Sequence, residues 1–293
     1  MFPVIGSVTD EFRMKCILEY YNIQTLYHAA AYKHVPLVEY NQSQGVLNNA
    51  IGTMVAAQAA INAKVETFIL ISTDKAVRPT NIMGVTKRIA ELVVQSLSMS
   101  TSSTSFAMVR FGNVLDSSGS VIPMFKKQIK KGGPVTVTDP GIVRYFMTIS
   151  EAVELVIQAS SMSEEGNLFV LEMGEPVRIV DLAIKMIQLS GLQLIDENNP
   201  NGDIEIKYTG LRPGEKLYEE ILATKETIKT ENPLIFRAEE AIIEWTLLKP
   251  MLEELKQSCI TTDQTEIRRL LVKLVPESKI QSPSVDLLSN EKS

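Results

Sequence analysis

The chain has 293 residues, of which 45% are hydrophobic and 22% are charged, and its formal net charge is −6. This composition is typical of an ordinary soluble protein with a large core, and the net negative charge argues against a nucleic-acid surface or a basic membrane patch. Cys16 and Cys259 are too few for a disulfide framework or a zinc site. Because no apolar run is long enough to span a membrane and no signal peptide is evident, we expect a cytoplasmic chain without membrane contact, nucleic-acid partner or metal.

The first two-thirds of the chain alternates short apolar runs with helical periodicity. This pattern predicts an α/β fold with a doubly wound, Rossmann-like parallel sheet and crossover helices. In chain order we expect a strand end at 3–6, a helix over 10–21, a strand over 25–28, a helix over 49–63, a strand over 66–72, a helix over 82–96 and a strand over 106–111.

Beyond residue 112 the pattern becomes mixed. Here we expect strands at 135–137 and 169–171 and helices over 150–161, 179–189, 239–257 and 263–275. We therefore predict a partial dinucleotide-binding region (1–112), a mainly substrate-binding region of mixed α/β structure (113–225), a C-terminal helical region (226–280) and a disordered tail (281–293).

A glycine-rich turn is missing from this pattern. A dinucleotide-binding half opens with a strand, a glycine-rich turn and a helix whose N-terminus holds the pyrophosphate. No G-x-x-G-x-x-G occurs in the sequence, and its first residues correspond to the third strand of such a fold. We therefore expect the chain to lack a βαβ unit of roughly 30 or more residues.

The strongest chemical signal is Thr73-Asp74-Lys75, which follows a buried apolar strand. In open α/β sheets ligands bind at the carboxyl ends of strands, and an adjacent acid and base suit proton transfer. A solvated Asp-Lys turn is the alternative. Met83 and Lys87 follow at i and i+4 on a predicted helix and share one face, although core packing and a surface charge would also account for them.

Six segments in this order carry a resemblance to a known family. They are HAAAYKHVPLVE (28–39), NNAIGT (48–53), ISTDKAVRPTNIMGVTKRIAE (71–91), RFGNVLDSSGSVIPMF (110–125), RYFMTISEAVEL (144–155) and GLRPGEKLYEEIL (210–222). Over about residues 4–225 the chain resembles the bacterial polysaccharide-biosynthesis dehydratases of the short-chain dehydrogenase/reductase superfamily. These enzymes convert UDP-N-acetylglucosamine to UDP-2-acetamido-2,6-dideoxy-4-hexulose.

The resemblance implies roles for the residues around the acid and base. Thr73 would contact the sugar 4-hydroxyl, Asp74 would protonate the leaving 6-hydroxyl, and Lys75 would remove the C5 proton. Lys87 would bind the nicotinamide ribose. Met83 stands where most of the superfamily carries a tyrosine base, and a thioether has no proton to exchange. Thr73 with an ordered water, or Asp74 acting twice, are the candidates for deprotonating the 4-hydroxyl.

The resemblance also implies binding residues. Those expected to contact an NAD cofactor are Asp10 at the adenine, Ala29, Ala30 and Ala31 along the dinucleotide, and Asn49, which supports the active-site lysine. Those expected near the UDP-sugar are Lys33, His34, Asn113, Arg144, Arg212 and Glu215. The forked guanidinium groups of Arg144 and Arg212 also suit diphosphate oxygens on chemical grounds, although surface salt bridges are the alternative for both.

Three positions depart from the patterns of related proteins. Met83 departs from the tyrosine of the wider superfamily and resembles the residue at this position in the large branch of the family. Members of that branch are anchored to the inner membrane, with the part that resembles this chain in the cytoplasm. Ser7 replaces a usual Asp and Asp116 a usual Gly, and the added charge of Asp116 would weaken diphosphate binding.

Several readings stay open. A UDP-sugar 4-epimerase would need only hydride transfer, but it normally uses the tyrosine that is absent here. An inactive nucleotide-sugar-binding fragment is the other alternative, because the glycine-rich loop is absent. NAD is favoured over NADP by resemblance, and a homodimer through the two long helices of each subunit is common in the superfamily.

Overall fold

The computed structural model describes residues 1–101, 103–163, 166–220, 227–280 and 285–287. Most of the predicted tail (281–293) lies outside these residues. The chain forms two compact units. Unit 1 comprises Met1–Phe111, Leu155–Glu172 and Glu220–Ser293, and unit 2 comprises Gly112–Glu154 and Met173–Glu219. The chain thus leaves unit 1 next to the expected boundary near residue 113, but it returns for residues 155–172, so the units are not consecutive stretches.

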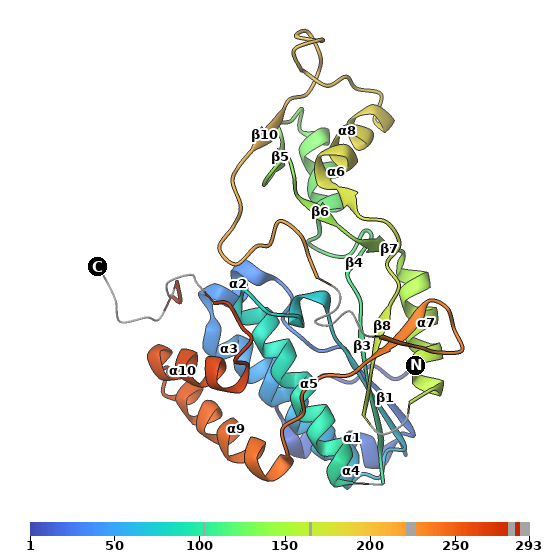
Figure 1. Cartoon of the computed structure of the whole chain (residues 1–293), viewed down its shortest axis with the longest axis vertical. Helices are drawn as coiled ribbons and strands as arrows, with labels where there is room; N and C mark the ends of the chain where they lie inside the picture. The colour runs from blue at the N-terminus through green and yellow to red at the C-terminus, as the bar shows by residue number, and fades with distance from the viewer. Residues whose placement is uncertain (102, 164–165, 221–226, 281–284, 288–293) are drawn as a thin grey trace. The chain divides into compact units, whose positions relative to one another are not determined.

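Unit 1 is built on a mostly parallel sheet. In spatial order its strands are β1 (Thr25–His28), β2 (Thr67–Ile71), β3 (Ser105–Arg110), β8 (Asn167–Leu171), β12 (Ile235–Ala238) and β11 (Thr227–Lys229) (Figure 1). The first four pair in parallel, and β12 and β11 continue the sheet antiparallel. The α/β fold class is confirmed, as are the strands predicted at 25–28, 66–72, 106–111 and 169–171.

The two faces of this sheet carry different helices. Tyr27 and His28 are consecutive in β1, so their side chains point to opposite faces. His28 Nε2 lies 3.0 Å from Thr53 Oγ1 in α4 (Gly52–Asn62), whereas Tyr27 Oη lies 3.0 Å from Ser160 Oγ in α7 (Ile149–Ser161). Unit 1 therefore has α4 on one face and the C-terminal part of α7 on the other.

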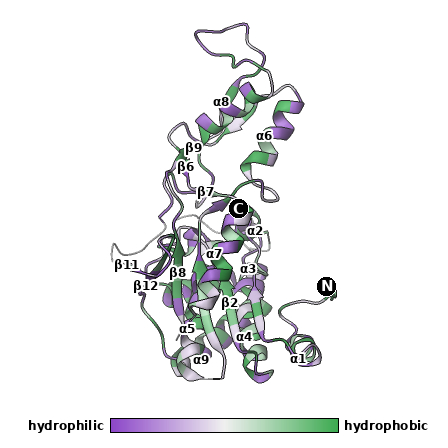
Figure 2. Ribbon diagram, turned by 90° about the vertical axis from the view of Figure 1, so that its right-hand side faces the viewer, coloured by the Kyte–Doolittle hydropathy of each residue, from purple (hydrophilic) through white to green (hydrophobic). Residues whose placement is uncertain are grey.

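Helix α5 (Ile82–Ser100) packs beside α4 and is buried along most of its length. The Asn81 side chain caps its N-terminus by accepting from Gly84 N at 2.8 Å. Its outer side is covered by α9 (Trp245–Ile260) and α10 (Gln264–Leu274), whose leucines join the same core. Figure 2 shows apolar residues on the strands of the sheet and also on the helices that pack against it. No helix of the described residues is long and apolar enough to cross a membrane.

One sequence prediction in unit 1 is wrong, and two predicted helices begin at other residues. Residues 3–6 form no strand. The helix expected over 49–63 begins at residue 42, as α3 (Gln42–Val46), and passes through a π-helical turn, η1 (Leu47–Ile51), into α4. The helix expected over 239–257 begins only at Trp245. It is preceded by Ile235–Ala238, which forms a strand between β8 and β11. The remaining helices in this region are α1 (Glu11–Tyr20), α2 (Val35–Tyr40) and the short 3-10 turn η2 (Asp74–Ala76).

Unit 2 has its own small core. Its helices α6 (Val121–Lys130) and α8 (Ile179–Leu189) enclose Phe125, Ala183 and Ile187 with the parallel pair β5 (Val135–Val137) and β10 (Ile206–Tyr208). Short pairs join β4 (Asn113–Val114) to β7 (Phe146–Met147) and β6 (Val143–Arg144) to β9 (Val177–Arg178). The mixed α/β character predicted for this part of the chain is confirmed.

Candidate active site

The acid–base loop, Thr73–Lys75, follows the carboxyl end of β2. Asp74 Oδ1 accepts hydrogen bonds from Thr73 Oγ1 at 2.8 Å and from Lys75 Nζ at 3.0 Å. The Asp74 side chain is 1% exposed and that of Lys75 is 20% exposed, so the ion pair is largely shielded from water. The structure thus brings the three predicted catalytic side chains of this loop into one hydrogen-bonded group.

Asp74 retains one unused oxygen. Its Oδ2 is buried and has no hydrogen-bond partner among the described residues. Its backbone N–H donates to Phe111 O at 3.1 Å, and Ser72 N donates to Val109 O at 2.8 Å, which extends the pairing of β2 with β3 into the loop. A buried carboxylate oxygen without a partner is costly, so this oxygen is a natural position for a proton or a ligand hydroxyl.

Gly84 sets the distance between the acid–base loop and α5. A Cβ at Gly84 would lie 2.2 Å from the carbonyl oxygen of Lys75, so only glycine allows this approach. Met83 and Lys87 lie in the first two turns of this helix and are 3% and 5% exposed. Neither is a surface side chain, which removes the alternative that Lys87 is a solvated charge.

The ammonium group of Lys87 lies under the end of β2, where Nζ donates to Ile71 O at 2.7 Å. Burial lowers the pKa of Lys87 to about 8, although Glu91 opposes the shift. Burial, together with the charge of Lys87, lowers the pKa of His28 to about 3, so His28 is neutral at pH 7. Lys87 can therefore change protonation state close to neutral pH.

Asn49 holds the segment that follows β1. Its Oδ1 accepts from Tyr32 N at 2.7 Å, and its Nδ2 donates to Tyr32 O at 3.1 Å and to Thr86 Oγ1 at 3.0 Å. Thr86 is the neighbour of Lys87, so Asn49 is linked to the lysine helix through that residue. The clamp fixes Ala29–Ala31, where Ala29 and Ala30 are exposed and could face a ligand.

The other predicted unit 1 residues lie at exposed positions. Asp10 caps α1, with Oδ1 accepting from Arg13 N at 3.0 Å. Lys33 and His34 are exposed immediately before α2. Their roles toward adenine and the UDP-sugar stay predictions.

In unit 2 the predicted substrate residues are partly engaged with one another. Arg144 is 8% exposed, and its guanidinium donates to the carbonyls of Val143 at 2.7 Å and Lys216 at 2.9 Å. It also lies 3.4 Å from Glu215 Oε1. In this arrangement Arg144 organises the 215–217 segment, so a direct contact with a diphosphate stays a prediction.

The remaining predicted unit 2 residues are more open. Arg212 is exposed, and its backbone N–H donates to Glu215 Oε2 at 3.1 Å. Asn113 is half-buried in β4. Asp116 pairs with Lys126 at 3.1 Å on the surface, which offsets the added charge that we expected to weaken anion binding.

Sequence reasoning missed four buried polar residues around the loop, His28, Ser72, Glu91 and Arg110. The available signal was a charged or polar residue at a position where strand or helix periodicity demands an apolar one. Glu91 and Arg110 fit that description, because both are 0% exposed and they form an ion pair with each other.

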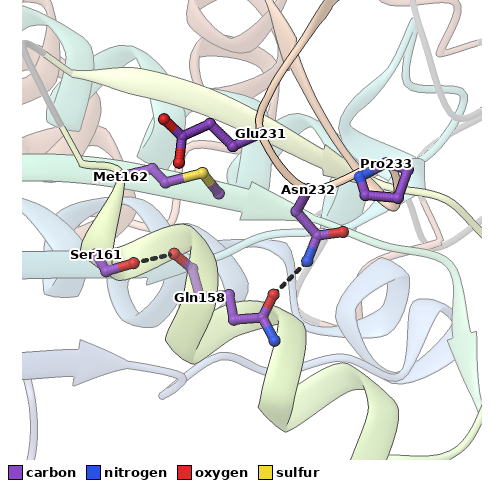
Figure 3. Close-up of a pocket in the computed structure, with 6 residues that line it drawn as sticks. All are labelled: Gln158, Ser161, Met162, Glu231, Asn232 and Pro233. Atoms are coloured by element: carbon purple, nitrogen blue, oxygen red, sulfur yellow. Dashed lines mark hydrogen bonds between the residues drawn. The ribbon is translucent and has the colours of Figure 1, made fainter.

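A separate open pocket of about 390 Å³ lies in unit 1 at the end of α7, beside the turn between β11 and β12 (Figure 3). Asn232 Nδ2 donates to Gln158 Oε1 across it. Its lining residues are Gln158, Ser161, Met162, Glu231, Asn232 and Pro233, and none of them is a predicted site residue. Among the described residues no group of three or more His, Cys, Asp or Glu side chains could hold a metal ion.

Comparison with known proteins gives three informative similarities. The chain is 54% identical over 224 residues to the capsular polysaccharide biosynthesis protein CapD of Staphylococcus aureus, a match covering 76% of this chain and 36% of CapD. It is 35% identical over 214 residues to the UDP-glucose 4-epimerase of Rickettsia rickettsii, covering 72% and 60% of the two chains. The solved structure of Pen from Bacillus thuringiensis is 34% identical with a TM-score of 0.71, over 85% of this chain and 80% of Pen.

These similarities define the family and the fold. The chain spans only about a third of CapD, so the activity of that whole protein does not transfer directly. Solved structures with the same fold at 16 to 21% identity hold NAD. The model of the polysaccharide biosynthesis protein family matches residues 1–240, which is most of the chain. The chain therefore belongs to the polysaccharide biosynthesis protein family and has the Rossmann-type fold of nucleotide-sugar dehydratases and epimerases.

Proposed function

We propose that this chain carries the acid–base chemistry of a nucleotide-sugar 4,6-dehydratase acting on UDP-N-acetylglucosamine in capsule or related polysaccharide synthesis. The observation that carries the proposal is the buried Asp74–Lys75 pair, with Asp74 Oδ2 unpartnered at the carboxyl end of β2. Elimination of water across C5 and C6 needs a base for the C5 proton and an acid for the 6-hydroxyl. Lys75 and Asp74 supply both, whereas epimerisation has no use for them.

The proton inventory closes with these residues alone. Asp74 accepts the proton of the 4-hydroxyl through Thr73, which already donates to its Oδ1. It then gives that proton to the departing 6-hydroxyl, which leaves as water. Lys75 acts in its neutral form, after it releases to solvent the proton that it holds in the ion pair with Asp74; it then removes the C5 proton and returns a proton to C5 at the end. One carboxyl acting twice thus replaces the tyrosine that Met83 cannot mimic.

The chain has residues that fit part of a bound NAD. The exposed alanines Ala29 and Ala30 offer a surface without bulky side chains, and the Asn49 clamp keeps that segment in place. Lys87 would hold the nicotinamide ribose, and Asp10 would hold the adenine. When bound, NAD would accept the hydride from C4 and return it to C6.

The test is to incubate the chain in D₂O with UDP-N-acetylglucosamine and with NAD in excess of its dissociation constant, and to follow the products by NMR. We expect a 4-keto-6-deoxy product that contains solvent deuterium at C5. Lys75→Ala should abolish the C5 exchange, whereas the matched control Lys15→Ala, on the exposed side of α1, should leave it intact. Retained C5 exchange in Lys75→Ala would refute the assignment of the base.

Similarity to a named UDP-glucose 4-epimerase supports a second candidate, a UDP-sugar 4-epimerase. Position 83 counts against it, because a buried thioether cannot serve as the base of the hydroxyl being oxidised. The same NMR experiment separates the two reactions. A C4 epimer with the 6-hydroxyl retained would identify the epimerase.

A further inference from the structure

A buried charge network lies directly beneath the acid–base loop. Its centre is Glu91, in the middle of α5 and 0% exposed. Ser72 Oγ donates to Glu91 Oε1 at 2.5 Å. Arg110 binds the same carboxylate in a bidentate manner, with Nε 2.7 Å from Oε1 and Nη2 2.5 Å from Oε2. Both carboxylate oxygens of Glu91 thus accept hydrogen bonds from residues at the carboxyl ends of β2 and β3.

Three further charged residues, Arg88, Glu240 and Glu277, belong to what we call the Glu91 network. Arg88 lies 3.3 Å from Glu91 Oε2 and 3.1 Å from Glu240 Oε2. Arg110 also pairs with both carboxylate oxygens of Glu240. Arg88 also lies 3.3 Å from Glu277 Oε1, whose side chain is 42% exposed, so two arginines face three glutamates. Burial alone would raise the pKa of Glu91, but Arg110 and Arg88 lower it, so Glu91 is ionised at neutral pH.

The network contacts each backbone segment that frames the acid–base loop. Ser72 immediately precedes Thr73 in the chain. Arg110 precedes Phe111, whose carbonyl accepts the hydrogen bond from Asp74 N. Ser72 and Arg110 therefore each adjoin a backbone segment that holds Asp74 in place.

The energetic character of the network also points to positioning. The buried charges of Arg88, Glu91 and Arg110 lose much of their hydration, and a buried ion pair seldom stabilises a fold more than an apolar replacement would. Directional, charge-assisted hydrogen bonds do restrict geometry, since the guanidinium fork accepts only one orientation of a carboxylate. A core built only for stability would not need them beneath the reacting groups.

We propose that Ser72, Glu91 and Arg110 are positioning residues that fix the acid–base loop, with Ser72 as the direct link between network and loop. This inference rests on the proposed function for its catalytic consequence. The placement of the loop itself can be tested without catalysis.

The test compares Ser72→Thr with Ser72→Val in the full chain. The two side chains have the same shape, and only threonine keeps the hydroxyl that donates to Glu91. We expect Ser72→Val to lower kcat by about 10-fold or more with KM little changed, because a small displacement of catalytic groups has effects of this size. Ser72→Thr should keep most of the wild-type kcat.

A second readout is amide hydrogen exchange by NMR, which requires no turnover. Exchange at Asp74 N should speed up about 10-fold or more in Ser72→Val, while Leu255 in α9 keeps its wild-type rate. Ser72→Ala serves in place of Ser72→Val if that variant fails to fold. Equal exchange at Asp74 in the threonine and valine variants would overturn the proposal.

The two hypotheses fail in different ways. If the wild-type chain makes no product, the proposed function fails, and amide exchange alone decides the positioning role. If the wild type is active and both variants match it in kcat and exchange, the positioning role fails while the proposed function stands.

Discussion

Lys75 Nζ lies 3.0 Å from Asp74 Oδ1, the same carboxylate oxygen that accepts from Thr73, whereas Asp74 Oδ2 has no hydrogen-bond partner in the part of the chain that the structure describes. The pair is thus asymmetric. Oδ1 holds Lys75 and can receive the 4-hydroxyl proton through Thr73, and Oδ2 can face the departing 6-hydroxyl. The chemistry assigned to the loop depends on this asymmetry.

Asp74→Asn should remove the acid while keeping the shape of the side chain. The amide oxygen can still accept from Thr73 and Lys75, but it cannot carry the proton to the leaving hydroxyl. We expect kcat to fall by about 10²- to 10⁴-fold, as for loss of a general acid, with a small change in the melting temperature. Single-turnover kinetics with thermal melts measure both. Asp181→Asn, at an exposed aspartate in α8, is the control, and full activity in Asp74→Asn would exclude the acid role.

Lys87 should make the stability of unit 1 rise with pH above neutrality. Its pKa is about 8 in the folded chain against 10.5 for an unperturbed lysine, so between these values the unfolded state binds the extra proton. The free energy of unfolding should therefore increase from about pH 8 to pH 10, by an amount on the order of 3 kcal/mol for a shift of this size. Urea titrations across this range measure it, with Lys87→Met as the reference. Parallel pH curves for the two proteins would contradict the assignment.

Gly84→Ala should disrupt the close packing of α5 against the backbone of the acid–base loop. Alanine normally favours a helix over glycine by about 1 kcal/mol, but here its Cβ would meet a backbone oxygen that cannot rotate away. We expect a net destabilisation of about 1–3 kcal/mol, typical of overpacking, and loss of turnover because Lys75 is displaced.

Gly52→Ala is the matched control, since it is also a helical glycine. Its added Cβ would lie 2.9 Å from a methyl group of the Val8 side chain, which can move. Denaturant unfolding of both variants should place Gly84→Ala well below Gly52→Ala in stability, and the reverse order would show that the Lys75 carbonyl is not a rigid neighbour.

Dinucleotide binding by these 293 residues should be weak. The sequence has no G-x-x-G-x-x-G, so the pyrophosphate would lack the backbone donors of a glycine-rich turn. Calorimetric titration with NAD should give a Kd of about 1 mM or weaker. Stoichiometric NAD in the purified chain would prove this prediction wrong.

The central strands and the long helices could be predicted from sequence because their periodicity is local. Residues 68–71 form a continuous apolar run, which fits a strand buried on both faces, and β2 lies there. The antiparallel strand β12 was missed because it is only four residues long and is defined by its pairing with β8, a long-range contact. A helix was predicted across the adjoining residues instead.

Some residues of the candidate site could likewise be predicted from local sequence, whereas others are brought together only by long-range packing. Thr73, Asp74 and Lys75 are adjacent in sequence, and their grouping in space follows from the strand end. Glu91 and Arg110 meet only because β3 and α5 pack together, so their partnership required the three-dimensional structure. The environment of Arg144 likewise depends on the carbonyls of Lys216 and Leu217, which no local pattern reveals.

The π-helical turn Leu47–Ile51 can be interpreted as a one-residue insertion in a helix. Such a turn contains one more residue than an α-helical turn, and π-turns are frequent at functional sites. Deleting a single residue there would restore a regular helix and rotate Asn49 away from Tyr32, while leaving both flanking helices intact. The turn can therefore be regarded as an insertion retained within a tolerant helix, and relatives that lack it would have to anchor the segment after β1 by other means.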